Sequence, residues 1–141
     1  MSAVVGPFSG AVKGFVTRTK ADVEKVWHEA TEELVEQAQL PISQGGNMHV
    51  ETGYLRASLR ASLSSLPSPT DGNRPTEHSK YYYRPGLVTR VIRSARYGKD
   101  TIYLGWTASY AGIREHRDGF MRLAAQNWRS IVKQVADRNR R

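Results

Sequence analysis

Residues 20–40 read KADVEKVWHEATEELVEQAQL, and this stretch decides the fold. Its apolar side chains recur every three or four residues, which is the period of an amphipathic α-helix. The helix ends at Pro41, and the same spacing allows a start as early as Ala11, with Ser9 as the N-cap. The apolar positions from Lys20 onward are Val23, Val26, Trp27, Ala30, Leu34 and Ala38.

A second amphipathic pattern closes the chain, from about Gly119 to Asp137. It has the same helical period, and its apolar side carries Trp128. We expect Trp128, Trp27 and Trp106 to be core residues. The apolar positions of this second stretch are Phe120, Leu123, Ala124, Trp128, Ile131, Val132 and Val135.

Between the two helices the sequence favours strands. Leu87–Arg93 and Thr101–Thr107 are rich in β-branched and aromatic residues, and the turn-like residues 97–100 join them. These features predict an antiparallel hairpin. In its second strand Ile102, Leu104 and Trp106 alternate with smaller or polar neighbours, so they are expected on the buried face. A further strand is predicted to run through Leu63.

A long exposed loop is predicted from Ser64 to Gly86. Four prolines and an Asp-Gly pair interrupt this stretch, so regular backbone pairing is not expected there. The loop is long enough to protrude as an interaction arm. With two long helices around a small antiparallel sheet, the sequence predicts a single α+β domain over residues 1–141.

The composition limits what the protein can do. The chain has 141 residues, of which 21 are Lys or Arg and 13 are Asp or Glu, so its net charge is +8. Such a charge favours contact with DNA, RNA or an acidic protein surface. Because there are no cysteines, disulfides and thiol catalysis are excluded. No stretch approaches the roughly 20 apolar residues of a membrane span, and no signal peptide is recognised, so we expect synthesis in the cytoplasm.

Charge is unevenly distributed along the chain. The first helix is acidic and the end of the chain is basic, which suggests head-to-tail contacts between copies; solvated helix faces are the simpler alternative. The acidic residues are Glu24, Glu29, Glu32, Glu33 and Glu36, and the basic ones are Arg122, Arg129, Lys133, Arg138, Arg140 and Arg141.

Two short motifs stand some fifty residues apart. The first contains Thr52-Gly53, then Leu55-Arg56, and it follows a long helix and a proline. The second runs from Tyr110 through Glu115 to Gly119-Phe120 and leads into the closing helix. In this order, the motifs resemble the tail-completion or head-tail joining proteins of long-tailed phages, whose pattern commonly has Asp where Glu51 stands and Pro where Gly119 stands.

This resemblance implies a structural virion protein of the phage neck and no enzymatic activity. Such proteins form a ring, typically sixfold, between the head connector or stopper protein and the tail tube or its terminator, around the DNA channel. A tail terminator that caps the tail tube is the alternative within this group. A small basic nucleic-acid-binding protein is the alternative from another class, although no helix-turn-helix or zinc-finger signature supports it.

The motif residues have simple local explanations. Thr52 is placed to cap a short helical turn, and Gly53 permits a backbone conformation or a close approach that a side chain would block. Glu115 and His116 lie near arginines, and we expect a polar corner with an ion pair rather than an acid-base pair. The four histidines fall in separate segments without metal-ligand spacing, so neither a metal nor a cofactor is expected.

Two further segments are candidate contact sites. Tyr81, Tyr82, Tyr83 and Arg84 stand at the end of the predicted loop, where we favour a protein contact over stacking on bases. The terminal Arg138, Arg140 and Arg141 either touch the phosphates of DNA in the channel or form a solvated helix end.

Overall fold

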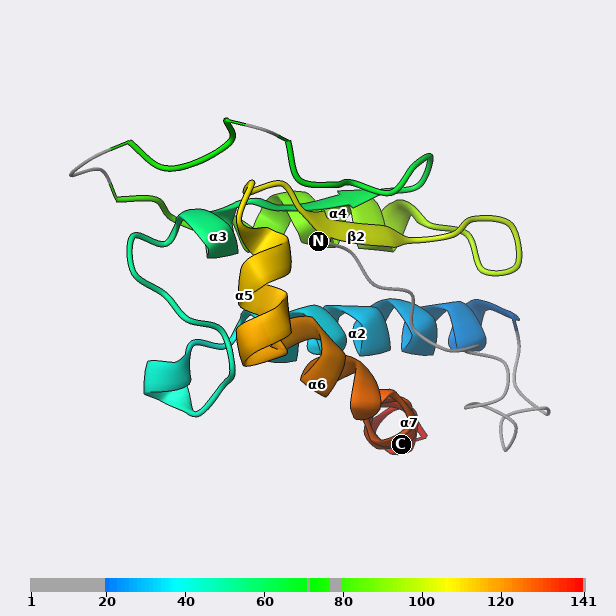
Figure 1. Ribbon diagram of the computed structural model, residues 1–141. Coiled ribbons are helices and arrows are strands. Elements are labelled where there is room, and N and C mark those ends of the chain that lie inside the picture. Colours follow the sequence, from blue (N-terminus) through cyan, green and yellow to red (C-terminus); the bar gives the residue numbers. More distant parts are fainter. Residues whose placement is uncertain (1–19, 71, 77–79, 141) are drawn as a thin grey trace.

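The helix predicted from residues 20–40 lies at the centre of the molecule, between a small sheet and the C-terminal helices (Figure 1). The computed structural model describes residues 20–70, 72–76 and 80–140 and is an α+β domain, as predicted. In chain order its elements are α2 (Lys20–Gln39), the 3-10 turn η2 (Ile42–Gln44), α3 (Tyr54–Ala57), β1 (Leu59–Ser62), α4 (Pro85–Ser94), β2 (Tyr103–Trp106), α5 (Ala111–Asp118), α6 (Phe120–Gln126) and α7 (Trp128–Arg138).

Helix α2 buries the side that the sequence predicts. Val26, Ala30, Leu34 and Ala38 are all buried, and the helix ends just before Pro41. The earlier start at Ala11 lies outside the described residues. Two polar side chains also lie on this buried side of α2: Thr31 and Gln39 are each at most 5% exposed.

The sheet has two antiparallel strands, β1 and β2, with Leu59 opposite Trp106 and Ser62 opposite Tyr103. The strand predicted at residues 101–107 is therefore confirmed, but its predicted partner is wrong. On β2, Leu104 and Trp106 are buried as expected, while Ile102 is only partly buried and precedes the strand. The ring of Trp106 meets Phe120 edge to face at 4.9 Å, which joins the sheet to α6.

Residues 87–93 are not a strand, because they form most of helix α4. Pro85 occupies the first turn, where its missing N–H costs nothing. Val88 and Ile92, one turn apart, are the buried residues of this helix, which packs against β1 and α2. The predicted loop of residues 64–86 accordingly ends at Arg84, since Pro85 and Gly86 already belong to α4.

The predicted C-terminal helix is two helices, α6 and α7, with Asn127 between them. The N–H of Asn127 donates to the carbonyl of Ala124, three residues back, which tightens the last turn of α6. At the break the chain changes direction between α6 and α7 (Figure 1). Phe120 and Met121 on α6 and Ile131 on α7 nevertheless belong to one core cluster. Both helices pack on α2.

The tryptophans predicted as core residues divide into two groups. Trp106 and Trp128 are buried, whereas Trp27 is partly buried and packs edge-on against the ring of Tyr97.

Across the described part of the chain, no helix combines the length and the apolar character needed to cross a membrane.

Candidate functional site

The structure brings the two sequence motifs together beside α3. The Thr52 hydroxyl accepts the backbone N–H of Tyr54 at 3.2 Å, one residue earlier than a standard N-cap, because Gly53 occupies the cap position. The ring of Tyr110, from the second motif, lies 6.5 Å from that of Tyr54. Residues of both motifs line a pocket of about 250 Å³.

Gly53 has both features for which a glycine was predicted here, an unusual backbone conformation and a close approach of another segment. Its φ is +85°, in the left-handed region that favours glycine. A β-carbon at this position would overlap the carbonyl oxygen of Tyr81. The backbone N–H of Tyr81 in turn donates to the carbonyl of Thr52 at 2.9 Å. The first motif therefore holds the far end of the loop directly against α3.

This loop, residues 63–84, is called the arm below. Its first half is also tied to the body. Asn73 is the main link, because its side-chain amide donates to the Thr107 carbonyl at 2.6 Å and its backbone carbonyl accepts the N–H of Ser109 at 2.8 Å. The hydroxyl of Tyr54 donates to the Asn73 side chain. The arm thus lies along the end of the sheet at its described points.

Arg56 and Leu55 have structural roles. Leu55 is buried in the core. The Arg56 Nε donates to the backbone carbonyl of Gln39 at 2.9 Å, at the C-terminal end of α2. The buried Gln39 amide returns a bond to the Arg56 carbonyl at 2.7 Å and accepts the indole N–H of Trp106 at 2.8 Å. Sequence reasoning missed Gln39, whose only signal was its place one turn after Val35 on the buried side of α2.

The second motif shapes the turn between α5 and α6. Glu115 is buried, and its two oxygens accept the backbone N–H groups of Met121 and Arg122, both at 2.9 Å. Its carboxylate therefore satisfies the first turn of α6, and the ion pair expected there joins Arg114 and Asp118 instead, at 2.8 Å. The neighbouring His116 is exposed, Gly119 has a φ of +63° at the turn, and Phe120 lies in the core.

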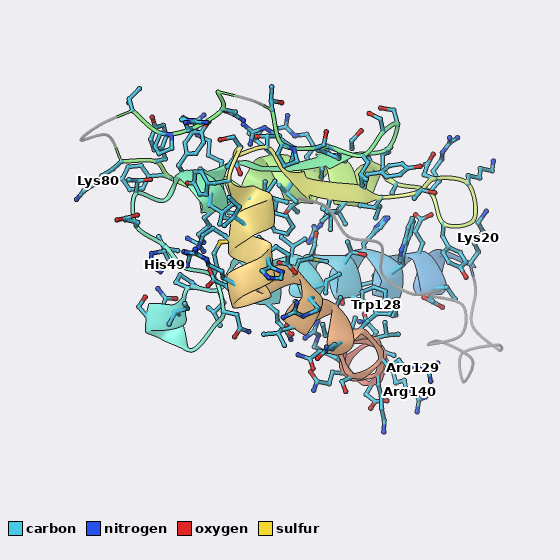
Figure 2. All side chains as sticks on the ribbon, viewed as in Figure 1. Lys20, His49, Lys80, Trp128, Arg129 and Arg140 are labelled. Carbon is cyan, nitrogen blue, oxygen red and sulfur yellow. The ribbon has the colours of Figure 1, made fainter. Side chains whose placement is uncertain are left out.

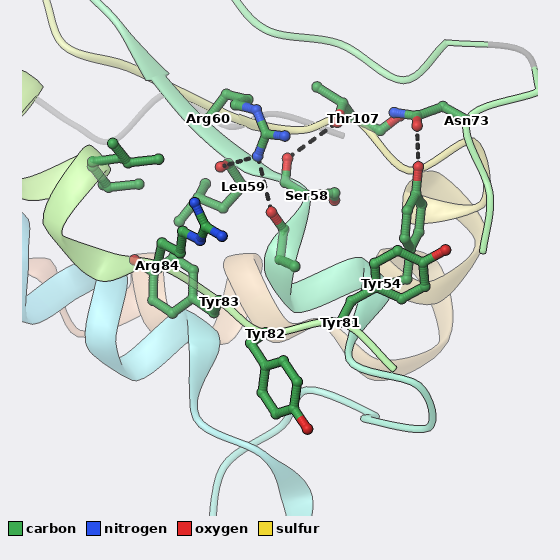
Figure 3. A pocket seen from close by; sticks show the side chains of 13 residues that line it. Tyr54, Ser58, Leu59, Arg60, Asn73, Tyr81, Tyr82, Tyr83, Arg84 and Thr107 are labelled. Atoms are coloured by element: carbon green, nitrogen blue, oxygen red, sulfur yellow. Dashed lines mark hydrogen bonds between the residues drawn. The ribbon is translucent and has the colours of Figure 1, made fainter. Parts of the chain in front are cut away.

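A second pocket, of about 370 Å³, opens where the arm returns to the body (Figure 3). We call it the tyrosine pocket. Figure 3 shows Tyr82 pointing away from Tyr81 and Tyr83. The Tyr82 side chain is 79% exposed, and Leu87, also on the lining, is 59% exposed. The residues that line it include Tyr54, Arg60, Asn73, Tyr81, Tyr82, Tyr83, Arg84 and Leu87.

The three tyrosines of the arm have different surroundings. Tyr81 packs edge-on against Tyr54 at 4.8 Å. Tyr83 is partly buried under the guanidinium of Arg56, 5.4 Å from the ring centre, and burial raises its pKa. Tyr82 contributes the exposed ring. Of the four predicted contact residues, Tyr82 and Arg84 are therefore the exposed ones.

The basic residues at the end of the chain face carboxylates of the same chain. Arg138 lies 3.6 Å from Glu29 of α2, and Arg140 lies 3.8 Å from Asp137. Arg141 lies outside the described residues. Part of the charge complementarity predicted between copies is thus met within one chain, since α2 and α7 pack on each other.

No family model, curated protein or solved structure matches this chain. Within the described ranges, no three His, Asp or Glu side chains gather closely enough to hold a metal ion. The tyrosine pocket, with an exposed ring, an exposed leucine and two arginines, has the composition of a surface that contacts another protein.

Proposed function

We propose that this chain is a structural protein of the phage neck, which assembles with its own copies into a ring joining the head connector to the tail tube around the DNA. The carrying observation is that residues of both motifs meet beside α3, where the arm is held with Tyr82 outward. Thr52 and Gly53 bind the backbone of Tyr81, and Tyr110 packs beside Tyr54.

The chemistry of the presented surface supports a protein partner. Tyr82 and Leu87 are exposed beside a hollow, and Tyr and Arg are enriched where protein interfaces bury their centre. Because the backbone of Tyr81 is fixed, little conformational freedom remains to be lost on contact. The described part of the arm is accordingly a preformed contact element, tied to the body by Asn73 and Tyr81.

Ring assembly requires two different surfaces on each copy that meet on neighbours and close by rotation. The tyrosine pocket supplies one of them. Glu24, Glu29 and Glu32 of α2 already bind groups of the same chain. Glu33 and Glu36 of α2 have the opposite charge to Arg60 and Arg84 at the tyrosine pocket, so they suit the second of the two surfaces.

The test is the mass of the purified protein by light scattering, alone and after mixing with tails from particles that lack it, with negative-stain imaging of the tail ends. A ring, or a monomer that caps tails and restores joining to heads, is expected. A monomer that ignores tails and binds DNA tightly would instead favour a nucleic-acid-binding protein.

The variant Leu87→Ser sharpens this test, and Ile113→Ser on α5 is its matched control. The two side chains are 59% and 61% exposed, so both changes should alter folding stability little. Only Leu87 lines the tyrosine pocket, so its loss should weaken ring or tail assembly. If the two variants assembled equally well, the tyrosine pocket would not be part of the interface between subunits or with the tail.

A further inference from the structure

The last three helices carry more positive charge than their carboxylates can neutralise. Residues 111–140 contain seven arginines and lysines and three carboxylates. All three carboxylates are engaged: Glu115 by backbone N–H groups, Asp118 by Arg114, and Asp137 by Arg140. Among the described residues, Arg117 on α5 has no carboxylate within ion-pair distance, and the same holds for three cations of α6 and α7: Arg122, Arg129 and Lys133.

These three cations lie on the solvent side of α6 and α7. Helix α7 buries Trp128, Ile131, Val132, Val135 and Ala136 against the body. Arg129 and Lys133 are exposed and one turn apart, so they form one row along the outer side. Figure 2 shows Arg129 at the lower edge of the molecule, where α7 lies. We call the exposed residues Arg122, Gln126, Arg129, Ser130, Lys133 and Gln134 the basic face. The exposed Asp137, one turn after Lys133, marks its end and lies 3.8 Å from Arg140.

We propose that the basic face binds the phosphate backbone of double-stranded DNA without reading its sequence. This role goes beyond the proposed neck function and does not depend on it. It also moves the DNA contact away from Arg138 and Arg140, which lie beside carboxylates of the same chain.

The composition of the basic face distinguishes DNA from a protein partner. Every side chain on it is a type that contacts phosphate: Arg, Lys, Ser or Gln. The large exposed apolar side chains of the described residues all lie elsewhere, from Ile42 to Ile113. Lys is depleted in the core of protein interfaces, and a face without an apolar centre lacks what anchors them. The tyrosine pocket, in contrast, exposes the large side chains of Tyr82 and Leu87.

The size of the effect follows from counterion release. Each phosphate contact adds about 0.9 to the slope of log affinity against log salt, so three contacts contribute about 2.7. Between 50 and 200 mM salt, these contacts alone lower the affinity about 40-fold. Non-specific dissociation constants of roughly 10⁻⁴ to 10⁻⁶ M are expected at physiological salt.

The experiment measures fluorescence anisotropy of two labelled 20-bp duplexes of unrelated sequence over a salt series. The face variant carries Arg122→Gln, Arg129→Gln and Lys133→Gln. Its matched control carries Arg74→Gln, Arg90→Gln and Lys99→Gln, at exposed positions away from α6 and α7. The two variants lose the same net charge. Gln is a good helix former, and circular dichroism with a thermal melt checks that both fold.

The face variant should lose up to about 2.7 of the salt slope, while the control keeps the slope of the parent protein. Both duplexes should bind equally. Equal losses in the two variants would show that net charge alone attracts DNA, and a strong preference for one duplex would show base readout; either result overturns the proposal. A variant with Arg129→Lys and Lys133→Arg keeps the charge and should bind like the parent.

Discussion

At the scale of single residues, Gly53 shows how an absent side chain holds two segments together. Its φ of +85° is costly for any residue with a β-carbon, and the carbonyl of Tyr81 occupies the space that the β-carbon would need. The arm and α3 meet at this point, so a change at Gly53 acts on both the stability of the domain and the position of Tyr82.

Gly53→Ala should therefore lower the free energy of unfolding by about 2 to 3 kcal/mol. Urea denaturation followed by circular dichroism measures this. Gly112→Ala is the control, because Gly112 lies in α5 with open space around it and ordinary helical φ. Its stability should stay the same or rise by up to about 1 kcal/mol. Equal effects of the two changes would contradict the role assigned to Gly53.

Glu115 and Gln39 show what sequence reasoning at this scale misses. The polar character of the corner at Glu115 was predictable, but its use as a cap depended on where α6 begins. Gln39 looked like an ordinary helix residue, although its amide joins α2, α3 and β2. Local conformations such as that of Gly53 follow from neighbouring residues, whereas these contacts depend on elements that are distant in the sequence.

At the scale of elements, the sequence predicted α2, β2 and the absence of helix or strand in most of the arm. It failed at residues 87–93, where β-branched residues favoured a strand. The buried positions Val88 and Ile92 are four apart, and Pro85 stands where helices commonly start, so helical signals were present. Packing against β1 and α2 outweighed the weak strand preference of these residues.

The contact between the arm and β2 gives a prediction at this scale. A β-carbon on Gly105 would overlap the carbonyl oxygen of Pro67, so Gly105→Ala should push the first part of the arm off the sheet. Trypsin should then cut the variant faster after Lys80, whereas the bond after Arg74 precedes Pro75 and resists trypsin. A loss of about 1.4 kcal/mol in the contact corresponds to about tenfold faster cleavage.

Gly86→Ala is the comparison for this experiment. Gly86 lies in α4 just beyond the arm and has nothing near the position of an added β-carbon. Its cleavage rate should match that of the parent protein. Mass spectrometry of the fragments identifies the cut sites, and an unchanged rate in Gly105→Ala would show that Pro67 does not hold the arm.

At the scale of the whole molecule, the partly buried phenols of Tyr83 and Tyr110 make the folding stability depend on pH in the alkaline range. Burial raises the pKa of Tyr83 and of Tyr110 above the ordinary value of 10.0. Because the folded pKa is the higher one, their contribution is complete below pH about 10 and is lost as the pH rises through the folded pKa. Stability should therefore decline above pH about 10.

Tyr83→Phe should make this decline less steep, since one of the two buried phenols is gone. Urea denaturation at a series of pH values gives the slope. The comparison is Tyr82→Phe, which removes the same hydroxyl from an exposed ring and leaves the buried phenols in place. If Tyr83→Phe keeps the full decline, burial of Tyr83 does not govern the alkaline behaviour.

The pairing of α2 with α7 has a consequence for how the chain reaches this state. The side chains of Glu29 and Asn139, 110 positions apart, form a hydrogen bond at 2.8 Å, and Arg138 lies beside the same carboxylate. The first described helix completes its packing only when the last one arrives, so folding must close a long loop and is expected to be slow for a largely helical chain. During translation the apolar side of α2 is not fully covered until α7 has been synthesised. A chain that ends before α7 therefore leaves part of that side exposed, and such incomplete products are expected to be removed by chaperones and proteases.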